Sequence, residues 1–190
     1  VRGLSGRSIP RPIDEVGGDA EDRVHLPIGE FARVLGGGIV LGSIVLIGGD
    51  PGIGKSTLML QMAMEMANSQ RVLYVSGEES ERQIKMRAVR LLSAVGAQRG
   101  EHSSKSSNGT AVPLPKNLLL VTETNLEVIL NHVSELKPDL LIVDSIQTVY
   151  LSELDSSAGS VSQVRECASH LRELAKSTGV SVFLIGHVTK

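Results

Sequence analysis

The sequence predicts one α/β domain in which a mostly parallel β-sheet is covered by helices on both faces. Two observations lead to this fold class. Short continuous apolar runs alternate with segments whose apolar residues recur at helical spacing, which is typical of parallel strands joined by crossover helices. A glycine-rich loop, residues 49–56, stands between the first such run and the first helical segment. Strand, loop and helix in this order indicate a unit of a parallel sheet.

Length and composition fit one globular domain with an aliphatic core. The chain has 190 residues, of which 41% are hydrophobic and only 2% aromatic, and its formal net charge is −2. This charge argues against a global basic field for nucleic acid, and the few aromatic residues argue against a base-stacking platform. Any DNA contact is therefore expected from local basic loops. No apolar run approaches the ~18 residues of a membrane span, so no membrane contact is expected.

The elements are expected in a regular order along the chain. Residues 1–25 are polar and predict a linker or flexible arm, and 26–190 predict the core. Strands are expected at 43–48, 71–76, 118–121, 140–144 and 180–186, and helices at 55–67, 80–95, 125–136 and 160–177. Asn125 is a candidate helix cap and Gly179 a helix end. Residues 97–115, rich in Ser, Gly, Asn and Pro, predict a flexible surface insertion.

The glycine-rich loop carries the strongest functional signal. It matches the pattern GxxxxGK[ST] of a phosphate-binding P-loop over Gly49, Asp50, Pro51, Gly52, Ile53, Gly54, Lys55 and Ser56. Glycines let backbone N–H groups turn toward phosphates, and the following helix points its positive end at them. Lys55 is expected to reach the β- and γ-phosphates of ATP, Ser56 to bind Mg²⁺, and Thr57 to support the α-phosphate.

Asp144 ends the apolar run LLIVD and is the second candidate. A carboxylate at the carboxyl end of a buried strand lies where open α/β sheets bind ligands, and it predicts a Walker B acid that holds Mg²⁺ through water. An aspartate in this position can also be an ordinary helix cap, but the P-loop favours the metal role. The next residue is Ser145, whereas many P-loop ATPases have glutamate there, so the catalytic base is expected elsewhere.

Glu78 and Glu79 follow the strand expected at 71–76. Two carboxylates at a strand tip beside the phosphate loop are suited to orienting water, and we predict Glu78 as the base and Glu79 as its helper. The alternative is that they are first-turn helix acids, favoured by the helix dipole. His187 follows the last expected strand and is either a catalytic γ-phosphate sensor or a structural turn residue.

Taken together, these motifs resemble the bacterial RadA (Sms) family of DNA-repair proteins, which have a RecA-like core. The resemblance covers 26–190 and rests on the segments GGDPGIGKSTLMLQ, YVSGEES, LLIVDSIQT, GSVSQVRE and LIGHVTK, in that order. It implies a RecA-like P-loop NTPase that hydrolyses ATP with Mg²⁺. It also implies a DNA-dependent enzyme of recombinational repair that processes branched intermediates, promotes branch migration and forms a hexameric ring.

The resemblance implies further roles for individual residues. Gln147 or His187 would sense the γ-phosphate, and Lys190 would reach a neighbouring subunit's nucleotide. A loop over 155–165 would face the interior of the ring, where Gln163 and Arg165 would contact single-stranded or branched DNA. For Arg165 the alternative is an ordinary ion-pair partner on a solvated helix face.

The sequence also departs from the family pattern. The family carries an N-terminal four-cysteine zinc element, whereas Cys167 is the one cysteine of this chain. A KNRFG motif and a Lon-protease-like domain would lie beyond residue 190. The long segment at 97–115 leaves open a plant version, so a cytoplasmic location is expected for a bacterial source and a chloroplast or mitochondrion for a plant.

Two other functions remain open at this point. One is a RecA-like ATPase that acts on a protein partner, of the clock or signalling type. The other is a nucleotide-gated scaffold with negligible turnover.

Overall fold

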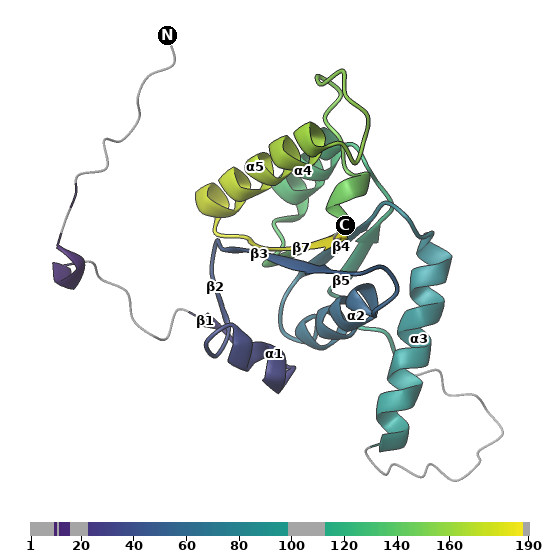
Figure 1. Ribbon diagram of the computed structural model, residues 1–190. Helices are drawn as coiled ribbons and strands as arrows, with labels where there is room; N and C mark the ends of the chain where they lie inside the picture. The colour runs from purple at the N-terminus through teal and green to yellow at the C-terminus, as the bar shows by residue number, and fades with distance from the viewer. Residues whose placement is uncertain (1–9, 11, 16–22, 99–112, 188–190) are drawn as a thin grey trace.

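A five-stranded parallel sheet forms the centre of the computed structural model, which describes residues 10, 12–15, 23–98 and 113–187 (Figure 1). The strand order is β3-β7-β6-β4-β5. The bounds of these strands are Ile44–Gly49 for β3, Val72–Ser76 for β4, Leu118–Val121 for β5, Leu140–Asp144 for β6 and Ser181–His187 for β7. All four pairings are parallel, so the predicted fold class is confirmed.

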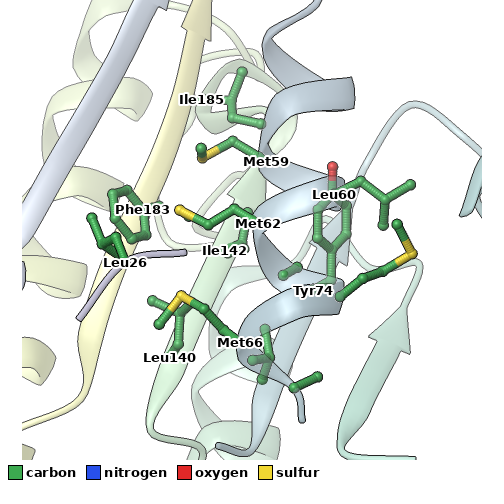
Figure 2. Close-up of a cluster of buried hydrophobic side chains, with 14 of the residues drawn as sticks. Leu26, Met59, Leu60, Met62, Met66, Tyr74, Leu140, Ile142, Phe183 and Ile185 are labelled. Atoms are coloured by element: carbon green, nitrogen blue, oxygen red, sulfur yellow. The ribbon is translucent and has the colours of Figure 1, made fainter. Parts of the chain in front are cut away.

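Helices pack on both faces of this sheet, as predicted. Helices α2 (Lys55–Met66) and α3 (Glu81–Gln98) cover one face, and α4 (Leu126–Leu136) and α5 (Val161–Thr178) cover the other (Figure 1). The α2 side is rich in methionine, and Figure 2 shows Met59, Met62 and Met66 directed from α2 toward the strands. Unbranched thioether side chains adapt to irregular gaps, which suits a core with few aromatic rings.

The helix ends follow the expected local chemistry. The side chain of Asn125 accepts a hydrogen bond from the Glu127 backbone N–H at 2.9 Å, which caps α4. Ser160 caps α5 in the same way, and α5 ends at Gly179, which has a φ of 79°. The boundaries of these helices were therefore predictable to within a residue or two.

The amino-terminal part begins earlier than expected. Strand β1 (Arg23–Val24) pairs antiparallel with β2 (Ile39–Val40), and helix α1 (Gly29–Val34) lies between them. The Arg23 side chain donates to the carbonyl oxygens of Leu35 and Gly38. Arg23 and Val24 therefore belong to the folded domain and not to the predicted arm over residues 1–25. The sequence did not reveal this strand, because a strand of two residues is too short to show a periodic pattern.

The predicted insertion over 97–115 is described only at its two ends. Residues 97–98 continue α3, which is longer than expected, and 113–115 lead into β5. The remainder, 99–112, lies outside the described residues, as does most of the arm predicted over 1–25. Among the described helices, none is both long and apolar enough to cross a membrane.

Candidate nucleotide-binding and hydrolysis site

The predicted site residues meet at the carboxyl edge of the sheet. The P-loop joins β3 to α2, Glu78 follows β4, Asp144 ends β6 and His187 ends β7. Strand pairing sets their mutual placement, since Gly49 lies opposite His187 and Ser76 lies opposite Asp144. Parallel strands bring their carboxyl ends to one edge, so groups far apart in sequence converge there.

The P-loop is folded around its own lysine. Gly54 is the N-cap of α2 with a φ of 95°, a left-handed conformation that glycine adopts without strain. Lys55 is buried, and its Nζ donates to the carbonyl oxygens of Gly49 and Asp50 at 2.8 Å each. The same Nζ lies 3.3 Å from Nδ1 of His187. Lys55 is thus held at the mouth of the loop, where a phosphate would meet both its charge and the amino end of α2.

Ser56 and Asp144 form the candidate metal site. Oγ of Ser56 donates to Oδ1 of Asp144 at 3.1 Å, and the Asp144 side chain is buried. A hydroxyl and a carboxylate at this spacing are the hard oxygen donors that Mg²⁺ takes, with water and substrate phosphates completing its shell. The residues present therefore fit the magnesium ion that the P-loop implies.

The second oxygen of Asp144 has a partner that the sequence did not suggest. The hydroxyl of Tyr74 donates to Oδ2 at 2.6 Å inside the core. Burial, followed by the charge of Asp144, holds the pKa of the Tyr74 hydroxyl far above its usual range. Tyr74 therefore remains a hydrogen-bond donor over the whole range of pH in which the protein would work.

Glu78 lies in the centre of the site, as predicted for the base. Its Oε1 accepts from Oγ of Ser145 at 2.8 Å and lies 3.6 Å from Nε2 of His187. Half of its side chain is exposed, so water reaches the carboxylate. His187 in turn links Glu78 to Lys55 through its two ring nitrogens.

Glu79 occupies a different place from its neighbour. Its carboxylate forms an ion pair with Arg87 of α3, and its backbone N–H donates to Oγ of Ser76. The expected role as helper to Glu78 has no support in these contacts, because the ion pair directs the Glu79 carboxylate toward α3. No pattern in the sequence singles out Arg87, which is one of several basic residues in α3.

The two candidate γ-phosphate sensors are in contact. Nε2 of Gln147 donates to the backbone oxygen of His187 at 3.1 Å, while Oε1 of Gln147 is buried and has no hydrogen-bond partner among the described residues. Gln147 belongs to the short 3₁₀ helix η2 (Ile146–Thr148), directly after β6. A movement of β7 at its tip would therefore reach η2 through this contact.

Gln163, which we predicted to contact DNA, is buried in this structure. Its side chain is 1% exposed, and its amide bonds the backbone of the preceding loop at Leu151, Leu154 and Ser156. The predicted loop over 155–165 ends at Ser160, where α5 begins.

Arg165, the second residue expected to contact DNA, lies on the surface. Its side chain is 80% exposed, and its nearest acidic partner is Glu166 at 3.7 Å. Lys190 lies outside the described residues.

Gly77 is expected to be intolerant of any side chain. A Cβ on this residue would lie 2.0 Å from Oγ1 of Thr148 and 2.9 Å from Cγ2 of Thr124. Gly77→Ala should therefore lower the free energy of unfolding by ~1–3 kcal/mol, the usual effect of overpacking, as measured by urea denaturation. Gly29→Ala is the matched control, because its added Cβ would meet no atom within 4 Å apart from its chain neighbours and the backbone of its own helix. An unchanged midpoint for Gly77→Ala would contradict the close approach of Thr148 to Gly77.

Comparisons with known proteins agree with this geometry. A family model described as "AAA domain" matches residues 19–190. The DNA repair protein RadA of Bacillus subtilis (strain 168) is 48% identical over 182 residues, which are 95% of this chain and 35% of that protein. The DNA repair protein RadA of Synechocystis is 51% identical over 164 residues, 85% of this chain and 32% of that protein. The chain thus spans about a third of the length of these relatives.

A solved structure supports the fold independently. A KaiC-like protein from Pyrococcus horikoshii OT3 has a TM-score of 0.61 and 21% identity, with 87% of this chain and 70% of that chain covered. At this identity the likeness concerns the fold alone. The chain belongs to the AAA domain family, and its sequence places it with the RadA-like ATPases of the RecA fold.

Proposed function

We propose that the chain is the ATP-hydrolysing core of a DNA-dependent ATPase in recombinational repair, which processes branched intermediates and promotes branch migration. One observation carries the proposal: Lys55, the Ser56–Asp144 pair and Glu78 with His187 meet at one edge of the sheet. The DNA part is supported by the relatives, which are named DNA repair proteins.

The residues divide the work of hydrolysis between them. Lys55 would exchange the carbonyl oxygens of Gly49 and Asp50 for the phosphates of ATP, and Ser56, with Asp144 acting through water, would hold Mg²⁺. A Mg²⁺ ion held there would neutralise negative charge on the phosphates. Glu78 accepts a proton from the attacking water, and His187, 3.6 Å away, senses the γ-phosphate. Ser145 orients the Glu78 carboxylate through its hydroxyl.

Assembly and location are part of the same proposal. We propose a ring of six copies, with nucleotide between subunits, contacting single-stranded or branched DNA. Because the compared relatives are bacterial, the proposed activity takes place in the cytoplasm, where bacterial DNA lies.

The test is the ATPase rate with and without single-stranded DNA, measured on this chain and on a longer protein that contains it. Stimulation by DNA in either protein would support the proposal. Stimulation in the longer protein alone would place the necessary DNA contacts outside this chain. Clear turnover that DNA does not change would favour an ATPase acting on a protein partner. Tight ATP binding with negligible turnover would favour a nucleotide-gated scaffold.

Arg165 is the residue to change for the DNA part of the proposal. Its exposed guanidinium lies one turn into α5, beside the loop that Gln163 holds. Arg165→Ala should weaken DNA binding and lower the slope of log affinity against log salt concentration by ~1, as for loss of one phosphate contact. Arg33→Ala is the matched control, because Arg33 is also exposed but lies on α1. Equal salt slopes for the two variants would remove Arg165 from the interface.

A further inference from the structure

Tyr74 is the one polar side chain in the middle of strand β4 that the mechanism above does not use. It is 1% exposed and stands among Val72, Leu73 and Val75 in a strand whose five residues are all buried. A phenylalanine would fill the same volume without bringing a hydroxyl into the core. A buried hydroxyl without a partner is costly, so its placement needs a specific acceptor.

The acceptor is the carboxylate of the proposed metal site. Tyr74 lies opposite Ile142 on the neighbouring strand β6, and Asp144 is two residues further toward the carboxyl edge, on the same face of the sheet. The tyrosine ring spans this offset, and its hydroxyl ends 2.6 Å from Oδ2 of Asp144. Figure 2 shows Tyr74 on the α2 side of the sheet, with its hydroxyl oxygen at the outer end of the ring.

The two oxygens of Asp144 therefore have separate partners. Oδ2 accepts from Tyr74 in the core, whereas Oδ1 accepts from Ser56 on the first turn of α2. A carboxylate held by one oxygen cannot rotate freely about its last bond, so the other oxygen is fixed toward the P-loop. Outer partners of metal ligands commonly act in this way, by fixing the orientation of the ligand.

We propose that Tyr74 is a positioning residue that locks the Asp144 carboxylate with Oδ1 directed at the magnesium site. The inference rests on the proposed nucleotide site. Tyr74 touches neither substrate nor metal, and its effect passes through Asp144. Its loss should weaken the dependence of nucleotide affinity on Mg²⁺ and leave metal-free nucleotide affinity unchanged, because the Tyr74 hydroxyl bonds Asp144, whereas Lys55 bonds the backbone of the loop.

The test is Tyr74→Phe, which keeps the ring and removes the hydroxyl. ATP affinity is measured by calorimetry over a series of Mg²⁺ concentrations and in EDTA. The Mg²⁺ concentration at half-maximal effect should rise by ~10-fold or more, the lower end of the range for outer partners of metal ligands. Affinity in EDTA should not change. Tyr150→Phe is the matched control, since Tyr150 is the other tyrosine of the chain and its backbone, not its hydroxyl, bonds Thr124 and Leu126.

An equal Mg²⁺ midpoint for Tyr74→Phe and the unchanged protein would overturn the proposal, while DNA-stimulated turnover would still stand. Conversely, absence of DNA stimulation would remove the proposed function and leave the Mg²⁺ result intact.

A second measurement uses the unchanged sequence and so does not depend on the folding of a variant. With 3-fluorotyrosine at both positions, the ¹⁹F signal of Tyr74 should shift when Mg²⁺ is added to the ATP complex, and the signal of Tyr150 should stay in place. A stationary Tyr74 signal would count against the proposal.

Discussion

Replacing Glu78 with glutamine is expected to lower kcat for ATP hydrolysis by ~10²-fold or more, the usual contribution of a general base. The amide keeps the size of the side chain and its hydrogen bond from Ser145, but it cannot accept a proton from water. ATP affinity should change little, because Lys55 and the P-loop backbone hold the phosphates. Turnover is measured by phosphate release, and affinity by fluorescent nucleotide titration.

Glu79→Gln is the control for this experiment. It makes the same chemical change one residue further along, where the carboxylate is paired with Arg87. We expect its kcat to remain within a few-fold of the unchanged protein, with a small loss of stability from the weakened ion pair. If Glu79→Gln is the slower variant, Glu79 and not Glu78 is the catalytic base. If neither variant is slower, the base lies elsewhere in the site.

Lys55→Met is expected to reduce kcat/KM by at least ~10²-fold, because it removes the charge that would stabilise the phosphates in the transition state. Methionine retains the apolar stem, which matters since Lys55 is only 7% exposed. Unlike the Glu78 variant, this one should also lose ATP affinity. Loss of the two hydrogen bonds from Lys55 to Gly49 and Asp50 should lower the free energy of unfolding without nucleotide by ~0.5–1.5 kcal/mol each. Circular dichroism should show that the variant is still folded at the temperature of the assay, so the defect would not come from misfolding.

The matched control is Lys85→Met, on the exposed face of α3. It should retain both affinity and turnover. Full ATP binding by Lys55→Met would show that the loop backbone alone suffices, and would contradict the contribution assigned to the lysine.

Much of the fold followed from local patterns. Strands β5 and β6 have the predicted bounds, because short apolar runs mark their ends. Helix α4 begins one residue later than predicted, directly after its Asn125 cap, and ends as predicted just before Pro138. The β1–β2 pair and α1 were missed because each is too short for periodicity to register. The predicted arm was consequently extended over Arg23 and Val24, whose pairing partners lie 15 or more residues away.

The candidate site was predictable where it depends on motifs and unpredictable where it depends on neighbours in space. The P-loop, Asp144 and Glu78 follow strands, so the rule that parallel strands share a carboxyl edge brought them together. Tyr74 and Arg87 were missed because each acts through a partner on another element. The one available signal was a tyrosine in an otherwise aliphatic strand. Gln163 was expected on the surface but is buried. The sequence pattern cannot distinguish a glutamine that is exposed on a helix from one whose amide holds a neighbouring loop.

The strand order also determines when this site can exist during synthesis. Among the described strands, β3 pairs only with β7, and Lys55 and His187 are separated by 132 positions in the chain. The P-loop thus emerges from a ribosome early but has no sheet to join until the last described strand is made, and closing so long a loop is slow. Until then β3 has no partner among the strands that the structure describes. We therefore expect the nucleotide site to form only when β7 takes its place between β3 and β6.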